Sequence, residues 1–246
     1  MAKSKNHVFN SPFLIICVFL VSKPSPSKGL DCKPLFFKGS SVILISDENI
    51  SKDRISIPVI LAQGALQSHL TNLGIRKFVS IHVKSAECLD THYFAVLIGA
   101  GATTVNPYLT IDSIYQRFEK GLFGKLTFDE CTQRYVKAIN DGLLKIMSKM
   151  GISVLSSYRG GLNFQSLGLS RSLVSEYFPG LESRISGIGI LGIEEMIKKH
   201  HEKTFRENVI SLPIGGIYKY RNGGEIHGYQ AKTMHLLQSA VTNDSF

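Results

Sequence analysis

The sequence predicts an α/β domain with a mainly parallel sheet flanked by helices. Short β-branched runs such as Val42–Ile45 alternate with longer amphipathic patterns, and glycine, asparagine or proline separates one from the next. Buried parallel strands appear as short continuous apolar runs, and their alternation with helices is typical of a parallel sheet. The 246 residues suffice for one large domain, or for one domain with an appendage, and can bury a core without disulfides.

Residues 1–30 differ from the rest of the chain. Lys3 and Lys5 precede the apolar run Phe13–Val21, and a polar spacer with two prolines follows it. This order resembles a secretory signal, although the run is too short to span a bilayer. The alternative is an unrelated leader that packs on the domain or stays disordered. We therefore expect a leader at residues 1–30 and one domain at residues 31–246.

In the first half of the domain, each predicted strand is followed by a turn or a helix. Pro58 begins a helical pattern that ends at Gly74, and a second pattern, Glu87–Ile98, ends near Gly99. Asn106-Pro107 then turns the chain. The predicted strands are Val42–Ile45, Lys77–Val83 and Thr103–Val105.

The clearest helix spans Phe128–Met150. Thr127 and Glu130 have the spacing of a capping box, and Gly151 suits the left-handed residue that ends a helix. An apolar stripe follows the helical period: Val136, Ile139, Leu143, Leu144, Met147 and Met150. We expect a strand at Ile152–Leu155 directly after this helix.

The last part of the chain alternates short elements with glycine-rich turns. After a loop at Ser156–Gly161 we expect two short helices, a glycine turn at Gly187–Gly192, a helix, a hairpin turning at Asn222-Gly223-Gly224 and a final helix. In chain order the helices and the hairpin are Asn163–Leu167, Ser170–Tyr177, Ile193–Lys203, Ile217–Ile226 (the hairpin) and Gln230–Val241.

The net charge of +9 is spread along the chain. The densest cluster, Lys198–Lys203, has no aromatic interleaving and is expected to be a solvated helix face, so nucleic acid is not an expected partner. Four scattered cysteines form no CxxC pair, which fits a reducing compartment and small-hydrophobe roles: Cys17, Cys32, Cys88 and Cys131.

Two glycine motifs could contact a ligand. Gly187-Ile-Gly-Ile-Leu-Gly192 matches GxGxxG before a helix, but Leu181–Ser186 does not look like an apolar strand, and no acidic residue for a ribose follows at the usual spacing. We interpret it as a structural turn. Gly99-Ala-Gly-Ala102 could frame an anion, yet a tight turn from helix to strand explains it more simply.

Other chemistry is not visible in the sequence. The eight histidines lack HxxxH or HExxH spacing, and neither a GxSxG elbow nor a P-loop occurs. Asp47 ends a predicted strand, where α/β folds place ligands, but it is also an ordinary cap or turn residue, which we favour. We therefore assign no catalytic, cofactor-binding or metal-binding residue.

Several segments together resemble one family. They are Val42-Ile-Leu-Ile-Ser-Asp47, His92-Tyr-Phe-Ala-Val-Leu-Ile-Gly99, Val105-Asn-Pro-Tyr-Leu109, Gly142-Leu-Leu-Lys-Ile-Met-Ser-Lys-Met-Gly-Ile-Ser153 and Gly223-Gly-Glu-Ile-His227. In this order they resemble the latter part of the central domain of the glutamate synthase large subunit, over roughly residues 41–240. That resemblance also implies an α/β topology.

Glutamate synthase transfers the amide nitrogen of glutamine to 2-oxoglutarate and reduces the product to glutamate. In the family, a glutaminase domain and an FMN barrel with an iron–sulfur cluster do the chemistry, and the central domain links them. Their residues have no positions here, so the resemblance implies a cytoplasmic, non-catalytic central-domain fragment without cofactor. The alternatives are a scaffold subunit that docks separate glutaminase and FMN chains, with Lys149 and Arg159 at the interface, and an exported small binding domain.

Overall fold

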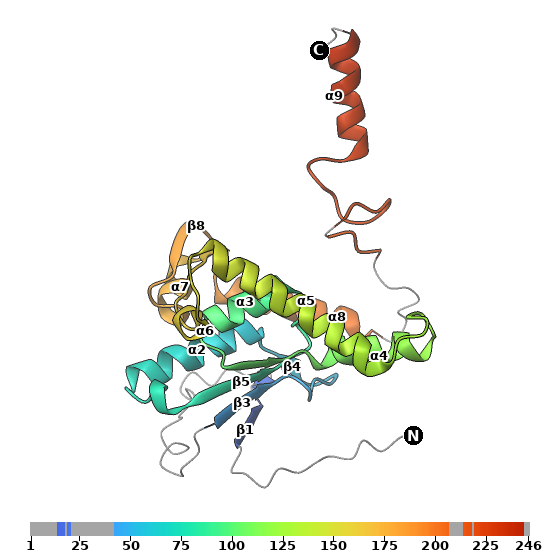
Figure 1. Cartoon of the computed structure of the whole chain (residues 1–246). Coiled ribbons are helices and arrows are strands. Elements are labelled where there is room, and N and C mark those ends of the chain that lie inside the picture. The colour runs from blue at the N-terminus through green and yellow to red at the C-terminus, as the bar shows by residue number, and fades with distance from the viewer. Residues whose placement is uncertain (1–13, 18, 21–41, 207–213, 218, 244–246) are drawn as a thin grey trace. The chain divides into compact units, whose positions relative to one another are not determined.

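The computed structural model describes residues 14–17, 19–20, 42–206, 214–217 and 219–243 of the chain (Figure 1). The chain divides into two compact units, residues 1–202 and residues 203–246. The α/β fold is confirmed in the first unit, where parallel strands are flanked by helices.

The main sheet has four parallel strands in the order β1-β3-β5-β6. Their bounds are Leu14–Cys17, Val42–Ser46, Ser80–Lys84 and Thr104–Asn106. The strands expected near residues 42 and 104 are confirmed. The middle strand begins at Ser80 and not at Lys77, because Arg76–Phe78 forms the 3-10 turn η1. A second, antiparallel pair joins β2 (Phe19–Leu20) to β4 (Ile55–Ser56).

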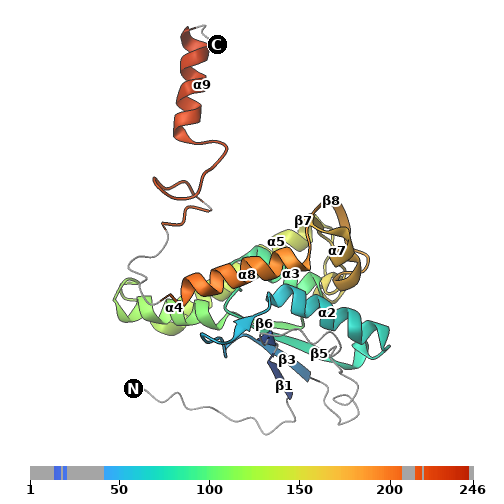
Figure 2. The same cartoon turned by 180° about the vertical axis from the view of Figure 1, so that it is seen from behind.

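Helices α2 (Val59–Asn72) and α3 (Thr91–Gly99) pack on the sheet (Figure 2). Aliphatic side chains of β3 and β5 point at them, and α5 adds Ile139 to the same core. Burying this many large apolar side chains is the main source of stability, at roughly 1.5–3 kcal/mol for each one fully removed from water. The most deeply buried members include Leu70, Ile81, Val83 and Leu97.

Helix α3 begins four residues later than expected. Asp90 accepts a hydrogen bond from the amide of Tyr93 at 2.9 Å and so caps the helix at Thr91, whereas Glu87 lies in the loop before it. Helix α4 (Tyr108–Glu119) was not expected, because Asn106-Pro107 was interpreted only as a turn.

Helix α5 (Phe128–Lys149) has both hydrogen bonds of the predicted capping box, and Gly151 follows it with a φ of +71°. The apolar stripe is only half used. Ile139 and Met147 are buried, but Val136, Leu144 and Met150 are exposed, the Leu144 side chain by 62%. The helix therefore lies on the outside of the unit and leaves part of its apolar face uncovered.

Two elements expected in the first unit are wrong. The segment Ile152–Leu155 is not a strand: Ile152 packs beside Met147, and the helical turn α6 (Leu155–Tyr158) follows. The buried Tyr158 hydroxyl donates to the carbonyl of Ala95 at 3.0 Å, which holds this turn against α3.

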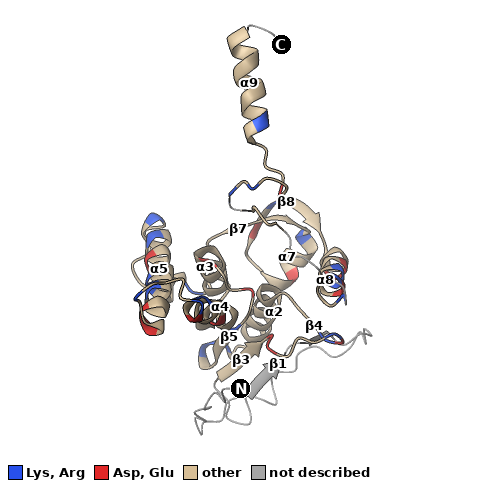
Figure 3. Ribbon diagram, turned by 90° about the vertical axis from the view of Figure 1, so that its right-hand side faces the viewer, with Lys and Arg blue, Asp and Glu red and all other residues tan. Residues whose placement is uncertain are grey.

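The expected helix at Asn163–Leu167 is also wrong, because Gln165–Leu169 forms strand β7, paired in parallel with β8 (Glu182–Ile188). Between them lies α7 (Arg171–Tyr177), which was expected and is capped by Ser170. Helix α8 (Ile190–Thr204) follows β8 and carries the predicted basic face. Two of its lysines pair with glutamates one turn earlier, and Figure 3 shows both basic and acidic residues on this helix.

In the second unit, the expected turn at Asn222–Gly224 forms, with φ of +76° at Gly223. The hairpin strands are wrong, since residues 214–217 and 219–226 contain no strand. The final helix is confirmed as α9 (Ala231–Asn243). Of the leader at residues 1–30, only β1 and β2 are described, and the rest lies outside the described residues. No helix among the described residues is long and apolar enough to cross a membrane.

Candidate functional site

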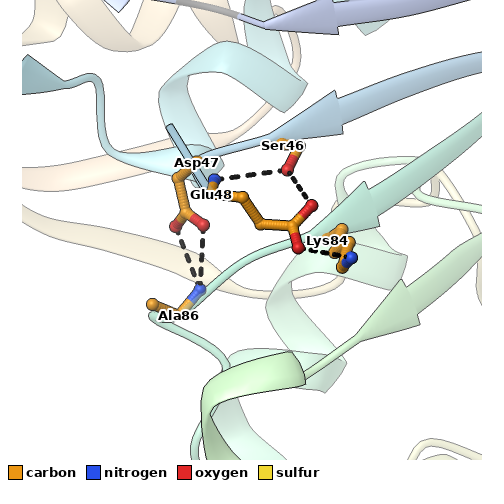
Figure 4. Close-up of polar contacts among 5 residues, drawn as sticks. All are labelled: Ser46, Asp47, Glu48, Lys84 and Ala86. Atoms are coloured by element: carbon orange, nitrogen blue, oxygen red, sulfur yellow. Dashed lines mark hydrogen bonds and ion pairs between the residues drawn. The ribbon is translucent and has the colours of Figure 1, made fainter. Parts of the chain in front are cut away.

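The carboxyl ends of β3 and β5 meet at one edge of the sheet, which is where α/β folds usually bind ligands. Asp47 directly follows β3, and its side chain is turned toward the loop after β5 (Figure 4). Its carboxylate accepts hydrogen bonds from the Ser85 hydroxyl at 2.6 Å and from the Ala86 amide at 3.0 Å. Asp47 is 5% exposed and Ser85 is fully buried. The backbone carbonyl of Asp47 also accepts a hydrogen bond from the Ile50 amide at 3.3 Å, which places Asp47 at the start of a turn as expected.

A second polar group lies next to Asp47 in the chain. Glu48 forms an ion pair with Lys84 at 2.5 Å and accepts a hydrogen bond from the Ser46 hydroxyl at 3.2 Å (Figure 4). The Lys84 ammonium also lies 5.7 Å from the ring centre of Tyr108. Burial is the largest cause that raises the pKa of the Tyr108 hydroxyl, and the charges next to its ring raise this pKa further. Each of these groups therefore has a partner within the chain.

Glu87 joins three elements beside this cluster. Its carboxylate accepts hydrogen bonds from the Val59 amide, in the first turn of α2, at 3.2 Å and from the Tyr93 hydroxyl in α3. Burial raises the pKa of Glu87, and these two hydrogen bonds act in the opposite direction. A carboxylate at a helix N-terminus satisfies a free amide and interacts favourably with the helix dipole. Pro58 has no side chain that could do this.

The chemistry open to this edge is limited. The oxygens of Asp47 and Glu87 already accept internal hydrogen bonds, and burial raises the pKa of the Cys88 thiol to about 12, which keeps it protonated. A protonated thiol is a poor nucleophile. Within the part of the chain that the structure describes, no three histidine, cysteine or acidic side chains converge to hold a metal. The edge is thus closed by its own side chains.

The GxGxxG segment lies in a different context from the one expected. Its first two residues belong to a strand, because β8 extends to Ile188, and Gly189 then turns the chain into α8, which contains the last three. A hollow of about 410 Å³ adjoins this turn, lined by Ser170, Ser172, Glu176 and Gly189 among others. No lysine or arginine is among its lining residues, while Glu176 is. A pyrophosphate would gain no cationic partner here and would lie near a carboxylate, which supports interpreting the glycines as a structural turn.

The glycine turn after α3 is also structural. Gly101 has a φ of +109°, and the amides of Gly101 and Ala102 bond back to α3 carbonyls. Arg76 donates to the Gly101 carbonyl at 2.6 Å, so a cation rather than an anion occupies this turn. Sequence reasoning did not identify Arg76 or Glu87, because each acts on elements distant in the sequence.

Lys149 is the last residue of α5 and Arg159 directly follows α6, and both are exposed. Three neighbours along the chain, Met150, Val154 and Leu155, are apolar and exposed as well. The charge of Arg159 acts on Arg76 and, after burial, is the second cause that lowers the pKa of the Arg76 guanidinium.

The family model described as "Glutamate synthase central domain" matches residues 33–170. Curated relatives match most of the chain. The chain is 52% identical over 208 residues to the glutamate synthase [NADPH] large chain of Azospirillum brasilense and 37% identical over 210 residues to that of Bacillus subtilis. It is 38% identical over 215 residues to the ferredoxin-dependent glutamate synthase of Pyropia yezoensis. These matches cover 82–85% of this chain but only 14% of each relative.

Proposed function

This chain belongs to the glutamate synthase family, which it matches through the central domain, and we propose that it is a non-catalytic α/β spacer of such an enzyme. The observation that carries the proposal is the closed carboxyl edge of the sheet, where Asp47 bonds to Ser85 and Ala86. An α/β enzyme would keep ligand-binding groups free at this edge. Here they hold two strand ends together.

The proposal extends to the reaction and its cofactors. Glutamine and 2-oxoglutarate would be converted to glutamate only by parts of a glutamate synthase outside these residues, and those parts would also carry FMN and the iron–sulfur cluster. This chain would bind neither. Its place would be the cytoplasm, and finding a chain that has lost its leader outside the cell would support the exported alternative instead.

The partners would be the glutaminase and FMN parts, either within one polypeptide or as separate chains docked on this scaffold. The turn between α5 and α6 supports this assignment, because Lys149 and Arg159 flank the exposed apolar side chains of Met150, Val154 and Leu155. Apolar surface rimmed by charge is typical of a protein interface.

Two measurements test the proposed function. The purified chain should form no glutamate from glutamine and 2-oxoglutarate, with or without added FMN and an electron donor. In the Azospirillum brasilense large chain, replacing the matched 208-residue segment by this sequence should preserve glutamate formation. Glutamate formation by the isolated chain would refute the spacer role, and an inactive but folded chimera would remove the support for membership in a working enzyme.

A further inference from the structure

The parallel pair β7–β8 is an incomplete sheet. Within the residues that the structure describes, these two strands pair only with one another, so each has an outer edge without a strand partner. Parallel strands are normally buried on both faces, and an isolated two-stranded ladder has little stability of its own. Figures 1 and 2 show the pair at the margin of the first unit, above α7.

One face of the ladder is apolar and bare. Leu167 of β7 and Ile185 of β8 are partners in the register, with 66% and 61% of their surface exposed. Ser166, the residue before Leu167, is 6% exposed, so β7 is covered at that position, whereas β8 is exposed along most of its length. Directly opposed aliphatic side chains contact one another, so Leu167 and Ile185 form one exposed apolar pair, with a register shift on either side of Leu167.

The polar groups of the ladder are already paired. Glu182 accepts from Gln165 at 2.7 Å and from Arg184 at 2.8 Å. At the other end the backbones lie very close together, because a Cβ on Gly187 would lie 2.1 Å from the Gly168 carbonyl oxygen. A partner would therefore meet open backbone and aliphatic side chains rather than charge. This chemistry suits an extended apolar strand, which gains affinity from main-chain hydrogen bonds.

We propose that a strand from the remainder of the glutamate synthase polypeptide, outside this chain, pairs along the β7–β8 ladder and covers Leu167 and Ile185. The inference rests on the proposed function and names the surface and the occupant. The matched segment is 14% of the Azospirillum relative, so most of that polypeptide lies outside it and can supply the strand. A bound strand would bury Leu167 and Ile185 and pair one outer edge of the ladder. It would thus remove the exposed apolar side chains and one of the unpaired strand edges.

The test uses the full chain and two probes, namely the parts of the Azospirillum brasilense large chain before and after the matched segment, co-expressed as separate polypeptides. The wild-type chain should capture at least one of them. The double variant Leu167→Lys/Ile185→Lys should weaken capture about tenfold or more. Leu122→Lys is the matched control, because Leu122 is 65% exposed and lies outside the ladder, in the connection between α4 and α5. It should bind like wild type.

Hydrogen exchange on the wild-type complex gives a second readout that does not depend on a variant. The amides of residues 165–169 and 182–188 should exchange about tenfold more slowly when the probe is bound. Normal capture by the double variant, or unchanged exchange, would overturn this inference and leave the spacer role intact. No capture by the wild-type chain would instead reject the proposed function with it. A concentration-dependent dimer that protects the same amides would assign the ladder to a second copy and also overturn the inference.

Discussion

The carboxylate of Asp47, at the end of β3, accepts a 2.6 Å hydrogen bond from the hydroxyl of Ser85, at the end of β5. Both residues are buried, Asp47 with 5% of its surface exposed and Ser85 with none. Hydrogen bonds that involve a charged group are short and strong. If one partner is removed, the buried donor or acceptor that remains is unsatisfied, and the fold loses the free energy of desolvating that group.

Replacing Asp47 by alanine should lower the free energy of unfolding by roughly 1–3 kcal/mol, because the Ser85 hydroxyl and the Ala86 amide lose their acceptor. Urea unfolding followed by circular dichroism measures this change. The control Asp53→Ala removes an exposed carboxylate and should change stability by less than about 0.5 kcal/mol. Equal stability of the two variants would show that the hydrogen bonds of Asp47 do not stabilise the fold.

Glu87 should make stability depend on pH. Burial raises its pKa above the ordinary value of 4.5, so the native chain keeps this proton to a higher pH than the unfolded chain does. The stability contributed by that proton is present at low pH and is lost as the pH rises from about 4.5 through the native pKa. Glu87→Gln removes the titration and keeps an acceptor for Val59 and Tyr93.

The measurement for Glu87 is the difference in unfolding free energy between wild type and Glu87→Gln at a series of pH values from 4 upward. Wild type should become progressively less stable relative to the variant as the pH rises. Glu202→Gln, at an exposed position of α8, controls for the loss of one negative charge. A difference for Glu87→Gln that stays constant, or that changes with the opposite sign, contradicts the assigned direction.

Thr127 caps α5 through a hydrogen bond from the Glu130 amide, and the Glu130 carboxylate bonds back to the Thr127 amide. Thr127→Ala should cost about 1 kcal/mol of stability, the usual effect of losing such a cap. Thr127→Ser keeps the hydroxyl and should recover most of it. Thermal unfolding of the three proteins distinguishes the cap from a simple packing effect, in which serine would behave like alanine.

Gly101 and Gly74 both have positive φ, +109° and +70°, but their surroundings differ. A Cβ on Gly101 would lie 2.2 Å from Oε1 of Gln67, whereas a Cβ on Gly74 would meet nothing within 4 Å. Gly74→Ala should cost about 1–2 kcal/mol from backbone strain alone. Gly101→Ala should cost more, because Gln67 must also move, and chemical denaturation of both variants compares the two. Equal costs would mean that Gln67 adapts freely.

The interface assigned to the α5–α6 turn predicts the effect of reversing two charges. Lys149→Glu together with Arg159→Glu should weaken capture of the glutaminase or FMN part about tenfold, the equivalent of 1.4 kcal/mol. Lys125→Glu, at another exposed lysine, should leave binding unchanged. Pull-down at a series of salt concentrations measures both. If all these variants bind alike, the turn does not form the interface.

Local signals account for the elements that the sequence predicted well. The bounds of α5 follow from Thr127, Glu130 and Gly151, which act within a few residues of the helix ends. Strand β3 follows from a continuous β-branched run. That Asp47 lies in a turn was expected. Its hydrogen-bond partners Ser85 and Ala86 lie almost forty residues away in the sequence, and only the fold brings them together with Asp47.

Non-local pairing explains the elements that were missed. Nothing within Gln165–Leu169 distinguishes a strand from a short helix, and its extended form depends on β8, beyond the intervening helix α7. Ile152–Leu155 has strand-like composition, yet the segment is held by Ile152 in the core and by the bond from Tyr158 to Ala95. Short apolar runs fit either state, so tertiary contacts decide between them.

By itself the sequence determined the family, the α/β class and those helices whose capping residues lie next to the helix ends in the sequence. The tertiary structure decided which side of each helix is covered, that the carboxyl edge of the sheet is closed, and that β7 and β8 form an open ladder. The physical reason is distance along the chain. Caps and periodicity act over a few residues, whereas burial and strand pairing depend on segments that meet only once the chain has folded.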